Sequence, residues 1–175
     1  EVDRWYGKFD WEGLVDELPT LRPAPAPRTW ERNITTPPYS TFLKISEGCD
    51  RMCAYCAIPL ITGRHRSRPM EEIIDETHDL VAKGVKEFNV IAQDLSAYGK
   101  DRYGTLMLPE LVKRMSDVPG VEWIRLHYAY PTDFPWELTK VMRERENVCS
   151  YLDIALQHIS TTVLTNMRRH IDSAQ

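Results

Sequence analysis

The sequence predicts an α/β protein, a partial (open) TIM-type βα barrel of parallel strands preceded by a Pro-rich linker. Strand and helix patterns alternate four times after residue 38. The connections exceed the roughly dozen residues that a parallel crossover needs. A closed eight-fold barrel takes about 250 residues, whereas only about 135 follow the linker. The sequence therefore predicts part of a barrel or an open sheet.

Residues 1–38 are expected to lie outside this barrel. Aromatic and apolar side chains within 1–18 fit a short helix near 10–18 that is too small for a core of its own. From 19 to 38 there are six prolines and little apolar periodicity, which predicts a semi-rigid linker. We therefore expect a stub and linker at 1–38, belonging to a missing upstream domain, and a barrel at 39–175 that is truncated at its C-terminus.

The first half of the barrel begins with an alternating strand at 40–46. Pro69 suits the first turn of a helix, and Gly84 suits the residue that follows its end. One face of this helix is apolar and carries Met70, Ile73, Ile74, Thr77, Leu80 and Val81. A second strand is expected at 87–92.

The second half repeats this order. A helix carries Leu108, Leu111, Val112 and Met115, and a Pro-Gly turn leads into a strand at 121–127. A helix at about 134–145, a strand at 151–155 and a final helix with Val163, Leu164 and Met167 complete the pattern.

Polar residues follow each predicted strand. The first strand leads into a cysteine loop, and the others lead into Gln93-Asp94, His127-Tyr128 and Gln157-His158. The C-terminal ends of parallel strands meet at one rim, where α/β proteins place their chemistry. We therefore expect these groups to gather there, although each pair alone is more typical of an ordinary polar loop. His127 better fits a structural residue at a strand end.

The cysteine loop has a C-x3-C-x2-C spacing formed by Cys49, Cys53 and Cys56. Three thiolates in such a loop can bind three irons of a cubane cluster and leave the fourth iron open. A zinc site with His65 as fourth ligand is the main alternative, but zinc usually takes two separated pairs. Cys149, before the fourth strand, is expected to be a small buried apolar residue.

Composition narrows the class of protein. Three of four cysteines lie within one short loop, which favours a metal and a reducing compartment, so we expect a cytoplasmic protein. No apolar run approaches the roughly 20 residues of a membrane span. The net charge of −4 disfavours a domain that mainly grips phosphate backbones. Arg64, Arg66 and Arg68 lie in one loop, where Arg66 or Arg68 could bind an anion, but the pattern is equally typical of a solvated basic loop.

The three-cysteine loop after the first strand of a βα barrel resembles the radical S-adenosylmethionine (SAM) superfamily. That resemblance implies a [4Fe-4S] cluster on Cys49, Cys53 and Cys56, with SAM bound at the open iron and split to a radical that abstracts hydrogen. Tyr55 matches the aromatic residue near the adenine. Gln93 and Gln157 are our candidates for contacting SAM, because their amides can donate to its carboxylate or accept from its hydroxyls.

A narrower resemblance is to the methylthiotransferases, and within them to the RimO type, which modifies an aspartate β-carbon in a small-subunit ribosomal protein. It is carried by residues 43–49, 63–69, 91–94, 98–99, 126–131 and 151–158. It implies a ribosomal protein as substrate, an electron donor, and a second [4Fe-4S] cluster in the missing N-terminal domain. Nucleic acid is expected only through missing domains.

Two alternatives remain open at this point. The first is the related tRNA adenosine methylthiotransferase, which a basic stripe would mark. The second is a zinc-stabilised binding module without catalysis. Metal content separates the second from the radical enzyme, since zinc gives a colourless protein and a cluster a brown one.

Overall fold

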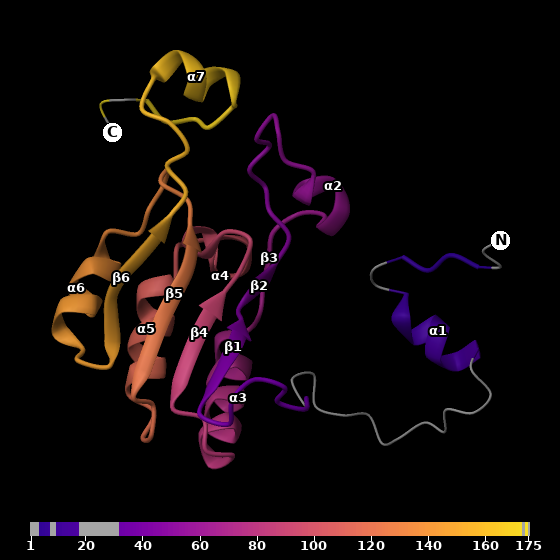
Figure 1. The fold of residues 1–175 in the computed structure, drawn as a ribbon, viewed down its shortest axis with the longest axis vertical. Coiled ribbons are helices and arrows are strands. Elements are labelled where there is room, and N and C mark those ends of the chain that lie inside the picture. Colours follow the sequence, from indigo (N-terminus) through magenta and orange to yellow (C-terminus); the bar gives the residue numbers. More distant parts are fainter. Residues whose placement is uncertain (1–3, 8–9, 18–31, 173, 175) are drawn as a thin grey trace. The chain divides into compact units, whose positions relative to one another are not determined.

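The structure, a computed structural model, describes residues 4–7, 10–17, 32–172 and 174, and the chain divides into units 1–33 and 34–175. The first unit contains helix α1 (Trp11–Glu17), where the sequence predicts a helix (Figure 1). The Tyr6 hydroxyl donates to Glu17 at 2.8 Å. Most of the predicted Pro-rich linker falls on 18–31, outside the described residues.

The second unit is built on a four-stranded sheet in the order β1-β4-β5-β6, and each neighbouring pair is parallel. The strands are β1 (Ser40–Lys44), β4 (Glu87–Ile91), β5 (Trp123–Ala129) and β6 (Val148–Ile154). The long crossover helices are α3 (Met70–Ala82), α5 (Leu108–Ser116) and α6 (Glu137–Glu144), which lie on one side of the sheet (Figure 1). The predicted α/β fold with parallel strands is confirmed.

Shorter elements decorate the ends of the strands. Strands β2 (Ser46–Glu47) and β3 (Arg66–Ser67) form an antiparallel pair. Between them lies α2 (Ile58–Thr62). The 3-10 helix η1 (Leu95–Ala97) and helix α4 (Lys100–Tyr103) follow β4, and α7 (Thr161–Asn166) follows β6. The sequence pattern does not predict β3, α2, η1 or α4, because each is too short to show periodicity.

The predicted strand at 40–46 is divided in two. Ile45 still donates its N–H to the Ile91 carbonyl at 3.1 Å, but its own carbonyl accepts from the Arg68 N–H at 2.9 Å. The chain therefore leaves the four-stranded sheet after Lys44 and pairs with β3. This turn carries the following cysteine loop beyond the end of the sheet.

The other strand boundaries shift by a few residues. The strand predicted at 121–127 is found at Trp123–Ala129, and the one predicted at 151–155 at Val148–Ile154. Tyr128 has φ of 77°, and the pairing register between β5 and β6 shifts near it. An irregularity of this kind breaks the alternation of side chains, so the sequence pattern does not locate the end of the strand. Cys149 lies inside β6 and is half-buried, so its expected place before the strand and full burial are wrong.

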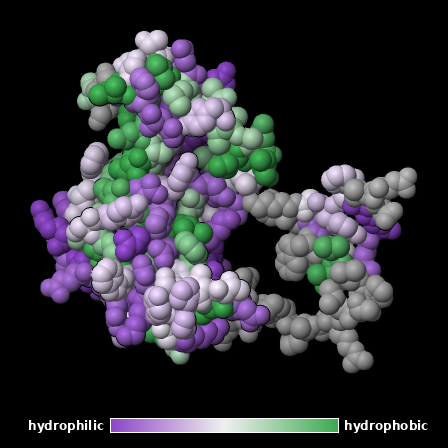
Figure 2. All heavy atoms as spheres, in the orientation of Figure 1, coloured by the Kyte–Doolittle hydropathy of each residue, from purple (hydrophilic) through white to green (hydrophobic). Residues whose placement is uncertain are grey.

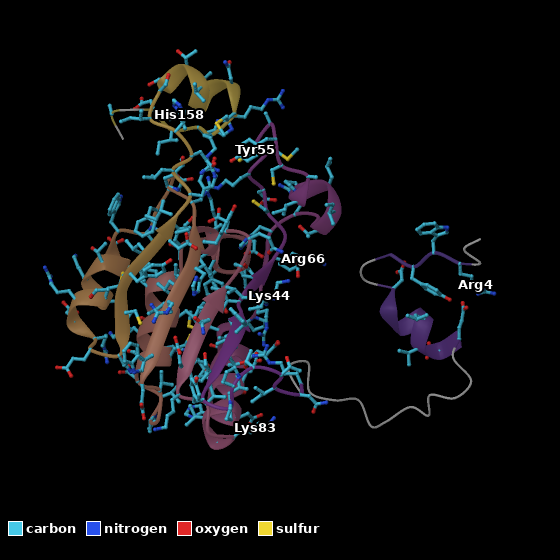
Figure 3. All side chains as sticks on the ribbon, viewed as in Figure 1. Arg4, Lys44, Tyr55, Arg66, Lys83 and His158 are labelled. Atoms are coloured by element: carbon cyan, nitrogen blue, oxygen red, sulfur yellow. The ribbon has the colours of Figure 1, made fainter. Side chains whose placement is uncertain are left out.

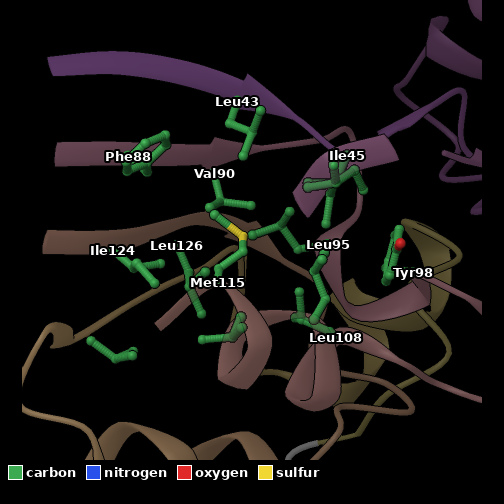
Figure 4. Packing of buried hydrophobic residues seen from close by; sticks show 14 of the residues in the cluster. Leu43, Ile45, Phe88, Val90, Leu95, Tyr98, Leu108, Met115, Ile124 and Leu126 are labelled. Carbon is green, nitrogen blue, oxygen red and sulfur yellow. The ribbon is translucent and has the colours of Figure 1, made fainter. Parts of the chain in front are cut away.

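The core lies between the sheet and the helices (Figure 4). Alternate strand residues point to the helices and are fully buried, among them Leu43, Phe88 and Ile124. The predicted apolar face of α5 meets them, and its residues Leu108, Leu111, Val112 and Met115 have no exposed surface. No helix in the described part of the chain has the length and apolar character to cross a bilayer.

Candidate functional site

The cysteine loop connects β2 to α2 and is folded back on residues 63–64. The Cys49 N–H donates to the Gly63 carbonyl at 3.2 Å. Gly48 has φ of 82°, and a Cβ at this position would collide with the Arg64 carbonyl. Glycine is thus required here both by backbone conformation and by the close approach of another segment. This contact fixes where the loop leaves the sheet.

The three cysteines of this loop are free thiols. Cys49 and Cys53 are each 8% exposed, and Cys56 is half-buried. Burial raises the pKa of the Cys49 thiol, since it disfavours the thiolate. Among the described residues, no three His, Cys, Asp or Glu side chains already surround a common metal position. The donor set, three free thiols on one short loop, fits an iron–sulfur cluster by its chemistry.

Arg51, between the first two cysteines, ties the loop to two others. Its Nε forms an ion pair with Asp94 at 2.9 Å, and its Nη2 donates to the Thr132 carbonyl at 3.0 Å. Asp94 also accepts from the Ser96 N–H at 3.0 Å, which caps η1. Three loops that follow β2, β4 and β5 therefore meet at one guanidinium. Of the polar groups predicted to gather at the rim, these contacts bring together the cysteine loop and Asp94.

Tyr130 lies beneath the loop, and guanidinium groups of Arg51 and Arg169 lie within 4.3 Å and 4.0 Å of its ring centroid. Its hydroxyl donates to the Arg169 carbonyl at 2.7 Å and is 3.8 Å from Cys53 Sγ. Burial raises the pKa of Tyr130, so the hydroxyl stays protonated. The Ala54 N–H donates to the Met167 carbonyl at 3.0 Å. The cysteine loop is thus attached to the segment after α7.

Of the three residues predicted to contact SAM, Tyr55 belongs to the cysteine loop, whereas Gln93 and Gln157 come from other loops. Tyr55 is half exposed, and its hydroxyl accepts from Arg169 at 3.4 Å (Figure 3 labels Tyr55 close to the segment around α7). Gln93 donates to Glu47, two residues before Cys49, at 2.6 Å, and its Oε1 is buried without a partner. Gln157 is exposed, with φ of 72°. Within the described residues, Gln93 and Gln157 do not contact each other.

Gln157 lines a pocket of about 870 Å³ beyond the end of β6. Its walls are mainly apolar and include Phe134, Trp136, Ile154, Leu156, Ile159 and Leu164. The volume of this pocket lies in the range of small-molecule sites.

A second exposed apolar surface covers α2, where Leu60 and Ile61 are 82% and 67% exposed (Figure 2).

Two predicted rim groups have structural roles. His127 lies within β5 rather than at its end, and its Nε2 is 3.2 Å from Asn89 Oδ1. Arg68 pairs with Glu72 at 2.9 Å and Glu76 at 2.8 Å, so two carboxylates already balance its charge. Arg64, by contrast, is 92% exposed and solvated.

Arg51, Tyr130 and Arg169 are the residues at this site that sequence reasoning missed. Arg51 stands inside the cysteine spacing, which is a signal that it would lie at the site. Tyr130 and Arg169 lie 77 and 116 residues from Cys53 in the chain. No local pattern marks them, because only the assembled rim brings them to the loop.

A sequence model of the radical SAM superfamily matches residues 43–175. The "Ribosomal protein uS12 methylthiotransferase RimO" of Bacteroides fragilis is 61% identical over 171 residues, which are 98% of this chain and 39% of that protein. The RimO proteins of Phocaeicola vulgatus and Chlorobium phaeobacteroides are 59% and 49% identical, over 100% and 98% of this chain and 40% and 38% of theirs. The chain thus spans about 40% of the length of the curated relatives it matches.

The fold is also similar to solved structures of a radical SAM methyltransferase, TsrM from Kitasatospora setae. One, described with cobalamin and a [4Fe-4S] cluster bound, has a TM-score of 0.55 at 18% identity, over 73% of this chain and 24% of that one. Another, with tryptophan and a SAM analogue, has a TM-score of 0.59 at 16% identity, over 79% and 28%. At this identity the likeness concerns the fold alone.

Proposed function

Because this chain belongs to the radical SAM superfamily, we propose that it is the barrel part of a methylthiotransferase that acts on ribosomal protein uS12. The observation that carries the proposal is the loop of three free cysteines at the rim of a parallel sheet. Identities of 61% and 59% to RimO proteins support the choice of reaction and substrate.

Cys49, Cys53 and Cys56 would hold a [4Fe-4S] cluster whose fourth iron binds SAM. Thiolates are the usual ligands of such clusters, and these three are free of disulfides and lie on one loop. The cluster supplies the electron that starts radical chemistry at a carbon which no acid or base can activate. The contribution of the protein is to bind, to orient and to exclude water.

The neighbouring side chains have separate tasks in this proposal. Tyr55 lies within the cysteine loop and offers a ring for the adenine. The unpartnered Oε1 of Gln93 offers an acceptor to the ammonium or hydroxyl groups of SAM. Gln157 offers its amide from the wall of the apolar pocket. Arg51 holds the loops together and does not contact the cofactor, since Asp94 already balances its charge.

The remaining parts of the reaction are proposed for the whole protein. An electron donor reduces the cluster, and a second [4Fe-4S] cluster, on cysteines outside this chain, is the site of sulfur insertion. A cytoplasmic location fits a ribosomal substrate and free thiols.

The test is anaerobic reconstitution of the full-length protein with iron and sulfide, followed by metal analysis and EPR of the reduced protein with and without SAM. Cys53→Ala should lose about four irons per chain and the SAM-dependent change of the EPR spectrum. Cys149→Ala is the matched control, because Cys149 lies in β6 away from the loop, and it should keep both. Bound zinc, or a spectrum indifferent to SAM, contradicts the proposal.

The substrate is tested separately with the intact enzyme. Mass spectrometry of uS12 after turnover should show a methylthio group on an aspartate. A methylthiolated adenosine in tRNA, with uS12 unchanged, would show that the enzyme is instead a tRNA adenosine methylthiotransferase.

A further inference from the structure

Arg169, three residues after α7, is a buried cation without a carboxylate partner. The residue is 3% exposed. Within the described residues its guanidinium contacts Cys53, Tyr55 and Ala155 but no Asp or Glu, and its buried Nε has no hydrogen-bond acceptor. Burying an unpaired charge is costly, so native proteins supply an opposite charge nearby. The buried guanidinium therefore indicates an anion at this place.

The contacts of the guanidinium identify that anion. Its Nη1 lies 3.5 Å from Cys53 Sγ, and its Nη2 donates to the Ala155 carbonyl. Its Cζ lies 4.0 Å from the centroid of the Tyr130 ring, which gives a favourable but neutral contact. Among these partners only the sulfur acquires a negative charge, when Cys53 becomes a thiolate ligand.

The backbone at this point is shaped to hold Arg169 in place. Arg168 and His170, on either side of it, have φ of 54° and 52°, a left-handed conformation that non-glycine residues rarely adopt. The Arg169 N–H donates to the Leu164 carbonyl at 3.0 Å, and its carbonyl accepts from the Tyr130 hydroxyl at 2.7 Å. Two strained residues that flank one buried arginine mark a positioned side chain rather than a loose chain end.

The other arginines near the loop differ from Arg169. Arg51 pairs with Asp94 at 2.9 Å, and Arg68 with Glu76 at 2.8 Å. Arg64 is 92% exposed, so solvent screens its charge. Arg169 alone of these four is both buried and without a carboxylate.

We propose that Arg169 is a positioning residue that balances the negative charge of the cluster by donating an N–H···S hydrogen bond to Cys53. The proposal rests on the proposed function, since the sulfur is charged when it binds iron. A positive charge and a hydrogen bond at a cluster sulfur stabilise the reduced, more negative state, so they raise the reduction potential. They also strengthen the hold of the loop on the cluster, because charge-assisted hydrogen bonds are the strong ones.

The experiment compares three variants of the reconstituted full-length protein. Arg169→Gln removes the charge, Arg169→Lys keeps it without the planar fork, and Arg168→Gln removes a neighbouring exposed arginine. The midpoint potential of the SAM-responsive cluster is measured by EPR-monitored redox titration. Iron release to a chelator is timed, and thermal unfolding of the cluster-free protein is recorded.

We expect Arg169→Gln to shift the midpoint to a more negative value and to release iron about tenfold faster. Arg169→Lys should show a smaller shift, and Arg168→Gln none. A structural role alone would lower the unfolding temperature of the cluster-free protein without moving the potential. An unchanged midpoint in a folded Arg169→Gln protein overturns the inference.

Three further outcomes separate this inference from the proposed function. If Arg169→Gln does not fold, Arg169→Met, which also removes the charge, replaces it, and a midpoint equal to that of the parent overturns the role of Arg169. If the parent protein binds no SAM-responsive cluster, the proposed function fails, and the role of Arg169 fails with it. A normal parent cluster together with an unmoved midpoint leaves the function standing.

Discussion

The ion pair between Arg51 and Asp94, with Nε and Oδ2 2.9 Å apart, joins two loops that are 43 residues apart in the chain. The side chains are 18% and 2% exposed, so solvent does little to weaken the pair. It connects the cysteine loop to the start of η1, and through Thr132 to the loop after β5. The rim of the sheet is therefore held by a buried charge rather than by apolar packing alone.

Removal of one partner of this pair should be strongly destabilising. Arg51→Met leaves the Asp94 carboxylate buried without its counter-charge, and we expect a loss of about 3–5 kcal/mol in the free energy of unfolding by urea. The control is Lys86→Met, which breaks a pair with Glu122 whose side chains are more than half exposed. It should cost less than about 1 kcal/mol. Equal losses in the two variants would refute a buried role for Arg51.

Gly48→Ala should displace the cysteine loop. The added Cβ would meet the Arg64 carbonyl, and the φ of 82° is unfavourable for alanine. We expect less bound iron after reconstitution and a lower unfolding temperature. Gly104→Ala is the matched control, because its φ is 75° but nothing lies within 4 Å of the new Cβ. It should lose stability through the backbone alone and bind iron normally.

Single replacement of each cysteine should show that the cysteines of the loop bind iron and that the cysteine in the sheet does not. In the reconstituted full-length protein, Cys49→Ala, Cys53→Ala or Cys56→Ala should each lose about four irons per chain, because the cluster needs all three thiolates of the loop. Cys149→Ala should match the parent in iron content within experimental error. Iron and sulfide are counted per chain after removal of unbound metal. Normal iron content in any of the three loop variants would exclude that residue as a ligand.

The stability contributed by Asp101 should depend on pH. Burial acts to raise the pKa of this carboxyl, but hydrogen bonds from the Ser67 hydroxyl at 2.6 Å and N–H at 2.9 Å outweigh it and lower the pKa below its ordinary 3.8. The carboxylate therefore stabilises the fold above pH 3.8, and this contribution disappears as the pH falls through the lowered pKa.

Urea unfolding of Asp101→Asn and the parent at several pH values tests this dependence. The variant should be less stable at pH 7, by about 1 kcal/mol for a partly exposed group that keeps an amide oxygen as acceptor. The difference should shrink below pH 3.8. A difference that stays constant down to pH 2.5 would show that ionisation of Asp101 does not stabilise the fold.

The fold could be predicted because its main elements are long and periodic. The apolar face of α3 and the alternation in β4 each repeat often enough to give an element its type and place. The division of the first strand could not be predicted, since it depends on a hydrogen bond between Ile45 and Arg68, which are distant in sequence. Tertiary pairing decided that boundary rather than local preference.

The candidate site was predictable only where chemistry is local. The three cysteines lie within eight residues of one another, so the local sequence is enough to predict them as ligands. Arg169 and Tyr130 belong to the site because the parallel sheet brings their loops to one rim. His127 shows the converse, since a polar residue expected at the rim lies inside β5 and contacts Asn89. The position of a polar residue along its strand, and not its residue type, decides whether it belongs to the site or to the interior of the sheet.

Strand β6 is the last in the order β1-β4-β5-β6, so one side of its backbone has no strand beside it in the described sheet. Tyr151 and Leu152 on this strand are 43% and 36% exposed. An uncovered edge with apolar side chains is a template for adding another strand. A preparation of this chain alone should therefore associate as its concentration rises, and charged substitutions along β6 should delay that association.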